Sequence, residues 1–186
     1  MPNRVALLRA VNLADHNKIS MADLKSFFAE LGFSDPRTLL QSGNVIFGPS
    51  GSEETDRRDP TEIEELLETE SERRLGLRTT YFVRTREEWQ RVIDENPFPK
   101  EAIDDPSHLV LLALKADPGP EKVNLLKTAL TGPEYLHAIG RHLYIVYPAG
   151  IGESKLTAAI IEKKLGTSCT GRNWNTVQKA LTLLSS

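Results

Sequence analysis

The stretch RVALLRAVNLADHNK, residues 4–18, organises the fold, because it reads as a β-strand that runs into a polar loop. Side chains on a strand alternate between its two faces, so Arg9 shares a face with Val5 and Leu7. A guanidinium beside apolar neighbours is costly unless a carboxylate, a carbonyl or a ligand pairs with it. We therefore expect solvent or a polar group over this face, and one half of a binding site in the loop.

The residues after this loop predict the remaining elements of a βαββαβ unit. The capping and turn signals indicate four further segments: a helix at residues 20–32, a hairpin at 38–47 with its turn at Ser42-Gly43, a helix at 60–76 and a strand at 79–84. We interpret the many glutamates of the second helix as a solvated face.

From residue 108 the same order of elements begins again. The predicted segments are a strand at residues 108–114, a helix at 121–130, a hairpin at 135–147, a helix at 154–165 and a short strand at 168–170. A further helix follows each half. TREEWQRV at residues 85–92 and TGRNWNTV at 170–177 share Thr, Trp and Val at one spacing, which favours a duplication. Each tryptophan is expected to pack its helix onto its own sheet.

This order predicts an α+β fold of two tandem ferredoxin-like βαββαβ sandwiches, each followed by an extra helix. The expected organisation is an N-terminal domain at residues 1–84, a connecting helix and proline-containing linker at 85–107, and a C-terminal domain with its terminal helix at 108–186.

Composition narrows the class of protein. The chain has 186 residues, a net charge of −3 and one cysteine, Cys169, so an internal disulfide is excluded and no global field attracts nucleic acid. It begins directly with a strand, and it has no apolar run of bilayer length. We expect a cytoplasmic protein without a membrane partner.

Two polar clusters are candidate ligand sites. In a βαββαβ sheet the start of the third strand lies beside the end of the first, which brings the polar loop to the hairpin turn. Taken singly, these residues are typical of turns, and only their clustering favours a site. Besides Arg9, the cluster comprises Asn12, Asn17, Lys18, Gln41, Ser42 and Asn44.

The second cluster is Arg172, Asn173 and Trp174, where the last strand is expected to give way to the last helix. The first half has Glu87 and Glu88 at the matching positions, which suit a helix N-terminus, whereas Arg172 and Asn173 remove that negative charge. An anion site is one interpretation. The other is that Arg172 pairs with a carboxylate of this protein and Asn173 is a helix cap.

Other motifs exclude common chemistries. The glycine-bearing loop at residues 147–155 has neither the spacing nor the charge of a phosphate-binding loop. The four histidines lack metal-ligand spacing, and no serine lies in a nucleophile elbow, so we expect no metal or cofactor and can name no catalytic residue or reaction.

The segments ALLRAVNLADHNKISMADLKSFFAELGF, RTLLQSGNVIF, NPF, SKL and TGRNWNTV together resemble the bacterial family called domain of unknown function 1697. The resemblance spans nearly the whole chain and implies two ferredoxin-like domains in tandem, with no established activity. The family pattern has a glycine after the strand arginine and a glycine-rich loop before the asparagine-lysine pair, where this chain has Ala10 and residues 13–15. Residues 41–44 and 172–176 match the pattern.

The leading hypothesis is a binding protein, enzymatic or not, for a small anionic or nucleotide-like ligand in the cleft between the two domains. Arg9, Lys18 and Arg172 would supply charge, and Asn12, Asn44 and Asn173 would recognise shape. A single-stranded RNA-binding module is the alternative, disfavoured by the acidic composition and by the lack of paired aromatic residues on the central strands. A protein-interaction or homodimer module is the third class, and the sequence decides neither the ligand nor between monomer and homodimer.

Overall fold

The computed structural model describes residues 3–11 and 18–185, which form two compact units. The first unit comprises Met1–Arg91 together with Lys179–Ser186, and the second comprises Val92–Gln178. The chain passes between the units within α4 (Arg86–Asp94) and again within α8 (Trp174–Leu184).

The first unit is built on a four-stranded antiparallel sheet in the order β2-β3-β1-β4. Leu7 pairs with Asn44 on one side and with Phe82 on the other, so the start of β3 lies beside the end of β1, as predicted. β4 is an edge strand. The strands are β1 (Arg4–Leu8), β2 (Arg37–Thr38), β3 (Asn44–Phe47) and β4 (Tyr81–Thr85).

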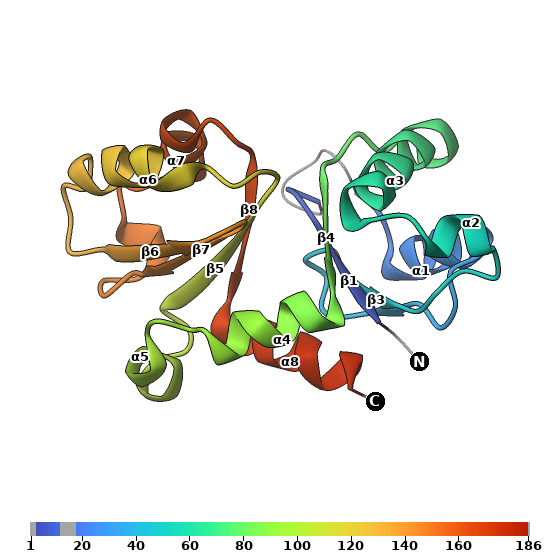
Figure 1. Ribbon diagram of the computed structural model, residues 1–186, viewed down its shortest axis with the longest axis horizontal. Coiled ribbons are helices and arrows are strands. Elements are labelled where there is room, and N and C mark those ends of the chain that lie inside the picture. The colour runs from blue at the N-terminus through green and yellow to red at the C-terminus, as the bar shows by residue number, and fades with distance from the viewer. Residues whose placement is uncertain (1–2, 12–17, 186) are drawn as a thin grey trace. The chain divides into compact units, whose positions relative to one another are not determined.

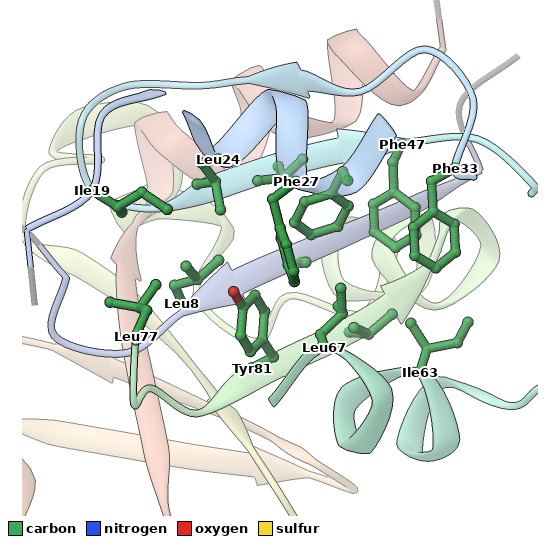
Figure 2. Close-up of a cluster of buried hydrophobic side chains, with 14 of the residues drawn as sticks. Leu8, Ile19, Leu24, Phe27, Phe33, Phe47, Ile63, Leu67, Leu77 and Tyr81 are labelled. Carbon is green, nitrogen blue, oxygen red and sulfur yellow. The ribbon is translucent and has the colours of Figure 1, made fainter. Parts of the chain in front are cut away.

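Two longer helices cover one face of this sheet (Figure 1). Ser20 caps α1 (Met21–Glu30) by accepting the Asp23 N–H at 3.0 Å, and Asp59 forms a capping box at the start of α3 (Pro60–Leu75). Figure 2 shows the core between them, where Phe27 of α1 and Leu67 of α3 meet sheet residues such as Leu8 and Phe47. A short helix, α2 (Glu53–Asp56), precedes α3.

The second unit has a four-stranded antiparallel sheet in the equivalent order, β6-β7-β5-β8. β8 is its edge strand, and α6 and α7 lie on one face (Figure 1). The elements are α5 (Pro99–Asp104), β5 (Leu109–Leu114), α6 (Gly119–Thr128), β6 (Tyr135–Ile139), β7 (His142–Val146), the 3-10 helix η1 (Ile151–Glu153), α7 (Ala158–Leu165) and β8 (Cys169–Asn173).

The α+β class is confirmed, and four element predictions need correction. The sequence predicted no helix at α2, where Ser52 acts as the N-cap. It assigned α5 to the linker, but Pro99 takes the first position of this helix, where the N–H that proline lacks would have no partner in the helix. Thr157, rather than Ser154, caps α7, so this helix starts four residues late. β8 continues to Asn173 because its polar residues pair with Leu111 and Leu112 of β5.

Within residues 3–11 and 18–185, no helix is long and apolar enough to cross a membrane.

Candidate functional site

The hairpin turn of the first unit is held by its own side chains. Asn44 is fully buried and donates hydrogen bonds from Nδ2 to the Leu39 carbonyl at 2.8 Å and to Ser42 Oγ at 2.9 Å. Gly43 has a φ of +71°, and a Cβ on it would lie 2.4 Å from Val11 Cγ2. Asn44 therefore closes the turn, as asparagines in turns usually do, and only glycine fits beside it.

Lys18 and Gln41 line one pocket of about 470 Å³ beside this turn, together with Ile19, Ser20 and Met21. The structure thus brings together two of the residues that the sequence proposed for the first cluster. Asn12 and Asn17 lie outside the described residues.

Arg9 follows β1 and is half-buried. Its N–H donates to the Thr80 carbonyl at 3.0 Å, and its carbonyl accepts from Thr79 Oγ1 at 2.6 Å. Ala10 then adopts a φ of +48°, a conformation that glycine adopts more readily than alanine.

The second cluster lies differently from the prediction. Arg172 is in β8 and not in the first turn of a helix, and Asn173 caps α8 by accepting the N–H of Thr176 at 3.0 Å and its hydroxyl at 2.9 Å. This cap occupies the predicted anion site at the helix N-terminus. Trp174 is buried, with its ring centroid 6.3 Å from that of Tyr144 in its own unit's sheet.

The two units match in a different register from the one read in the sequence. Arg84 pairs with Val5 across β1 and β4, and Arg172 pairs with Leu111 across β5 and β8. Each arginine donates from Nη1 to the carbonyl of the preceding residue at 2.7 Å, and the next residue caps the following helix. By its pairing, Arg172 therefore corresponds to Arg84 and not to Glu87, three residues away from the match that the sequence suggested.

In the first unit, carboxylates from α3 cover the outer edge of β4. The N–H of Tyr81 donates to Glu68 Oε1 at 3.0 Å, and the N–H of Val83 donates to Glu64 Oε1 at 2.7 Å. Arg84 Nη1 lies 3.4 Å from the same Glu64 oxygen, and both side chains of this pair are fully buried. Glu64 thus satisfies an edge N–H and neutralises a buried cation.

In the second unit, only one of these two carboxylates has a counterpart. The N–H of Cys169 donates to Glu162 Oε1 at 2.8 Å, as Tyr81 donates to Glu68. Glu64 is four residues before Glu68, and Ala158 is four residues before Glu162, so Ala158 takes the place of Glu64. Val83 is two residues after Tyr81, and Gly171 is two residues after Cys169, so Gly171 takes the place of Val83.

A pocket of about 420 Å³ opens at this place, and we call it the edge pocket. Ala158 and Gly171 lie on its wall and are exposed. Its apolar wall includes Val110, Leu112, Tyr147, Leu156 and Ile161, and its polar wall includes Ser107, Ser154, Thr157, Thr170 and Asn173.

Arg172 lies behind the wall of the edge pocket and carries a positive charge. Its Nη1 donates to Thr170 Oγ1 at 3.1 Å and to the Gly171 carbonyl, and both residues line the pocket. Burial lowers the pKa of the Arg172 guanidinium to about 10, so the group stays protonated at neutral pH.

Two acidic groups lie near other parts of the wall. Ser154 donates its hydroxyl hydrogen to Glu134, and Ser107 donates its own to Asp105 at 2.7 Å. The Ser107 hydroxyl holds the pKa of Asp105 below its usual value. These carboxylates disfavour an anion beside the serines, so the end of the pocket at Thr170 and Gly171, next to Arg172, is the end that suits an anion.

Sequence reasoning missed Glu64, Arg84, Ala158 and Gly171. A signal for Glu64 was available, because it is three residues before Leu67 and follows Ile63, on the apolar stripe of its helix. The interpretation of all glutamates in this helix as a solvated face was wrong for Glu64. Among the residues that the structure describes, no group of three His, Cys, Asp or Glu side chains is placed to hold a metal ion.

A model of the family described as "Protein of unknown function (DUF1697)" matches residues 1–144. The chain belongs to this family. The DUF1697 match ends within β7, so it includes Arg84 and Glu64, whereas the pocket residues from Tyr147 onward lie beyond it.

The fold of this DUF1697 protein is similar to that of a solved structure, the conserved bacterial protein SP0830 from Streptococcus pneumoniae. The two chains are 18% identical, the similarity covers 98% of each, and the TM-score is 0.74. At this identity the similarity shows a shared fold alone. No curated protein matches the sequence.

Proposed function

We propose that this DUF1697 protein binds a small anionic ligand in the edge pocket of its second unit. The observation that carries the proposal is a pocket of about 420 Å³ with a largely apolar wall, behind which the buried Arg172 holds its guanidinium against the lining residues Thr170 and Gly171. Ligand sites commonly combine such a volume with apolar walls and a few convergent polar groups. A ligand site in a cleft between the two domains stays a prediction.

The finer fold assignment is part of the same proposal. Strand order β2-β3-β1-β4 in one sheet and β6-β7-β5-β8 in the other, each with two helices on one face, supports two tandem ferredoxin-like units. Binding of single-stranded RNA is less favoured, because Phe82 and Tyr144 are at most 1% exposed, and the exposed ring of Tyr135 on the edge strand β6 already packs against Phe98 at 5.2 Å between centroids.

A thermal-shift screen against small carboxylates, phosphates and nucleotides tests the proposal, because a ligand that prefers the native state raises the melting temperature. Gly171→Val narrows the pocket by adding the side chain that Val83 has in the first unit. Gly51→Val is the matched control, since a Cβ on Gly51 meets nothing within 4 Å. We expect an anion that raises the Tm of wild type and Gly51→Val but not of Gly171→Val.

Equal ligand-induced shifts in all three proteins would place the ligand elsewhere. No shift with any of the anions would remove the support for ligand binding.

A further inference from the structure

The outer edge of β8 presents a backbone donor to the edge pocket. In a strand, the N–H groups of residues i and i+2 point the same way. The Cys169 N–H points away from β5, because it reaches Glu162 on α7 at 2.8 Å. The Gly171 N–H therefore points toward the same outer edge, where Gly171 is exposed and lines the pocket.

In the first unit, the backbone N–H at the position equivalent to Gly171 binds a carboxylate. There the equivalent N–H, that of Val83, donates to the Glu64 carboxylate at 2.7 Å, and the Arg84 guanidinium approaches the same oxygen. The second unit keeps the N–H at Gly171 and the arginine at Arg172, but Ala158 stands where Glu64 would be. The two donors that meet Glu64 in the first unit thus recur in the second, whereas α7 has no carboxylate at the position of Glu64.

The backbone conformation of Gly171 does not require a glycine. Its φ lies outside the left-handed region, and an added Cβ would meet only Val110 Cγ1 at 3.3 Å and Leu112 Cγ at 3.8 Å. A glycine inside a strand weakens it, and it often marks a place where a ligand approaches the backbone closely. The absence of a side chain here leaves the pocket open above the Gly171 N–H.

From these observations we infer that the ligand of the edge pocket is a small carboxylic acid with an apolar body, whose carboxylate takes the place that Glu64 fills in the first unit. The inference rests on the proposed function and names its ligand class. The carboxylate accepts the Gly171 N–H and faces Arg172, and the apolar body lies along Leu112, Leu156 and Ile161. The serine end, with Glu134 and Asp105 behind it, excludes a second negative charge.

Ala158→Glu tests this inference by supplying the missing carboxylate from the protein itself. The probe is the Gly171 amide in ¹H–¹⁵N NMR spectra, titrated with butyrate and benzoate, and in parallel with butyramide and inorganic phosphate. In wild type we expect both carboxylates, but not butyramide, to move the Gly171 amide proton downfield. Ala158→Glu is expected to show this downfield position without ligand and to bind the carboxylates about tenfold more weakly or worse, because a like charge then occupies the site.

Ala159→Glu, at the next exposed position of α7, is the matched control and is expected to bind the carboxylates like wild type. Unchanged carboxylate affinity in Ala158→Glu would overturn the inference. If phosphate perturbs the pocket amides and the carboxylates do not, the ligand class is wrong while anion binding at the pocket stands. If none of the four compounds perturbs a pocket amide, the proposed function fails together with the inference.

Discussion

At the scale of single residues, the clearest defect of the fold is the hydroxyl of Tyr81. Within residues 3–11 and 18–185 it is the one buried side-chain polar atom without a hydrogen-bond partner, and Figure 2 shows the ring among aliphatic and aromatic side chains. Burial raises the pKa of the Tyr81 phenol, and the nearby Ser71 hydroxyl opposes this increase only in part. We expect Tyr81→Phe to raise the free energy of unfolding by about 1 kcal/mol, measured by urea denaturation, because it removes an unsatisfied group.

Tyr144→Phe is the matched control for this change. The Tyr144 hydroxyl is also buried but donates to the Val92 carbonyl at 2.9 Å, so its removal should lower the free energy of unfolding by about 1 kcal/mol. A loss of stability in Tyr81→Phe would mean that the phenol oxygen has a partner after all.

Ala10 has a backbone conformation that conflicts with its side chain. A φ of +48° is strained for any residue with a Cβ, and glycine relieves that strain. We expect Ala10→Gly to raise the free energy of unfolding by up to about 1 kcal/mol, although glycine also makes the unfolded chain more flexible. Ala129→Gly, at a φ of −90°, should instead lower it, and equal effects at the two sites would contradict the prediction.

At the scale of elements, the buried pair of Glu64 and Arg84 joins α3 to β4. Removing one partner leaves the other charge buried, which costs about 3–5 kcal/mol. We therefore expect Glu64→Ala to lower the free energy of unfolding by about this amount in chemical denaturation. Glu65→Ala changes the exposed neighbouring glutamate and should stay within about 0.5 kcal/mol of wild type. Equal stabilities of the two variants would show that the pair contributes nothing.

The last turns of α3 carry an acidic group with a pH signature. Hydrogen bonds from Arg73 and Arg74 lower the pKa of Glu70 from 4.5 to about 2. A depressed folded-state pKa stabilises the fold above the unfolded value, and this contribution is lost as pH falls from about 4.5 to about 2. We expect NMR titration of the Glu70 carboxyl carbon to give a pKa near 2, and a value closer to 4.5 in Arg73→Gln/Arg74→Gln. A Glu70 pKa near 4.5 in the wild-type protein would contradict this prediction.

The elements that the sequence predicted well are those with local signals. Ser20 and Asp59 mark helix starts, and Gly76 and Gly166 end helices with positive φ. The elements that it missed depend on distant partners. β8 extends through polar residues because β5 pairs with them, a contact that no local pattern reveals.

The candidate site shows the same division. The meeting of Lys18 and Gln41 at one pocket follows from strand order, which the sequence predicted. Strand order does not reveal the edge pocket, because the pocket is open where the second unit has Ala158 and the first unit has the buried Glu64. This difference between the units appears only when they are matched by their hydrogen bonds and strand pairing. That match differs by three residues from the one that the two tryptophans suggested.

At the scale of the whole molecule, residues 179–186 belong to the first unit although they follow the second in sequence. Ala180 and Leu184 of this segment are each 1% exposed. We expect Leu184→Ala to cost about 2–5 kcal/mol and to speed hydrogen exchange of the buried strands β1 and β4 more than that of β5 and β7. Thr182→Ala changes an exposed residue of the same helix and should alter neither the free energy of unfolding nor the hydrogen exchange of these strands. Faster exchange in β5 and β7 alone would contradict the assignment of residues 179–186 to the first unit.

The return of the chain to the first unit also sets an order for folding during synthesis. A ribosome adds about 5–20 residues per second, so several seconds separate the emergence of Arg91 from that of Lys179. In that interval residues 92–178 of the second unit emerge in one continuous run, while the first unit still lacks its last segment. The half of the protein that is made first is therefore the half that is completed last.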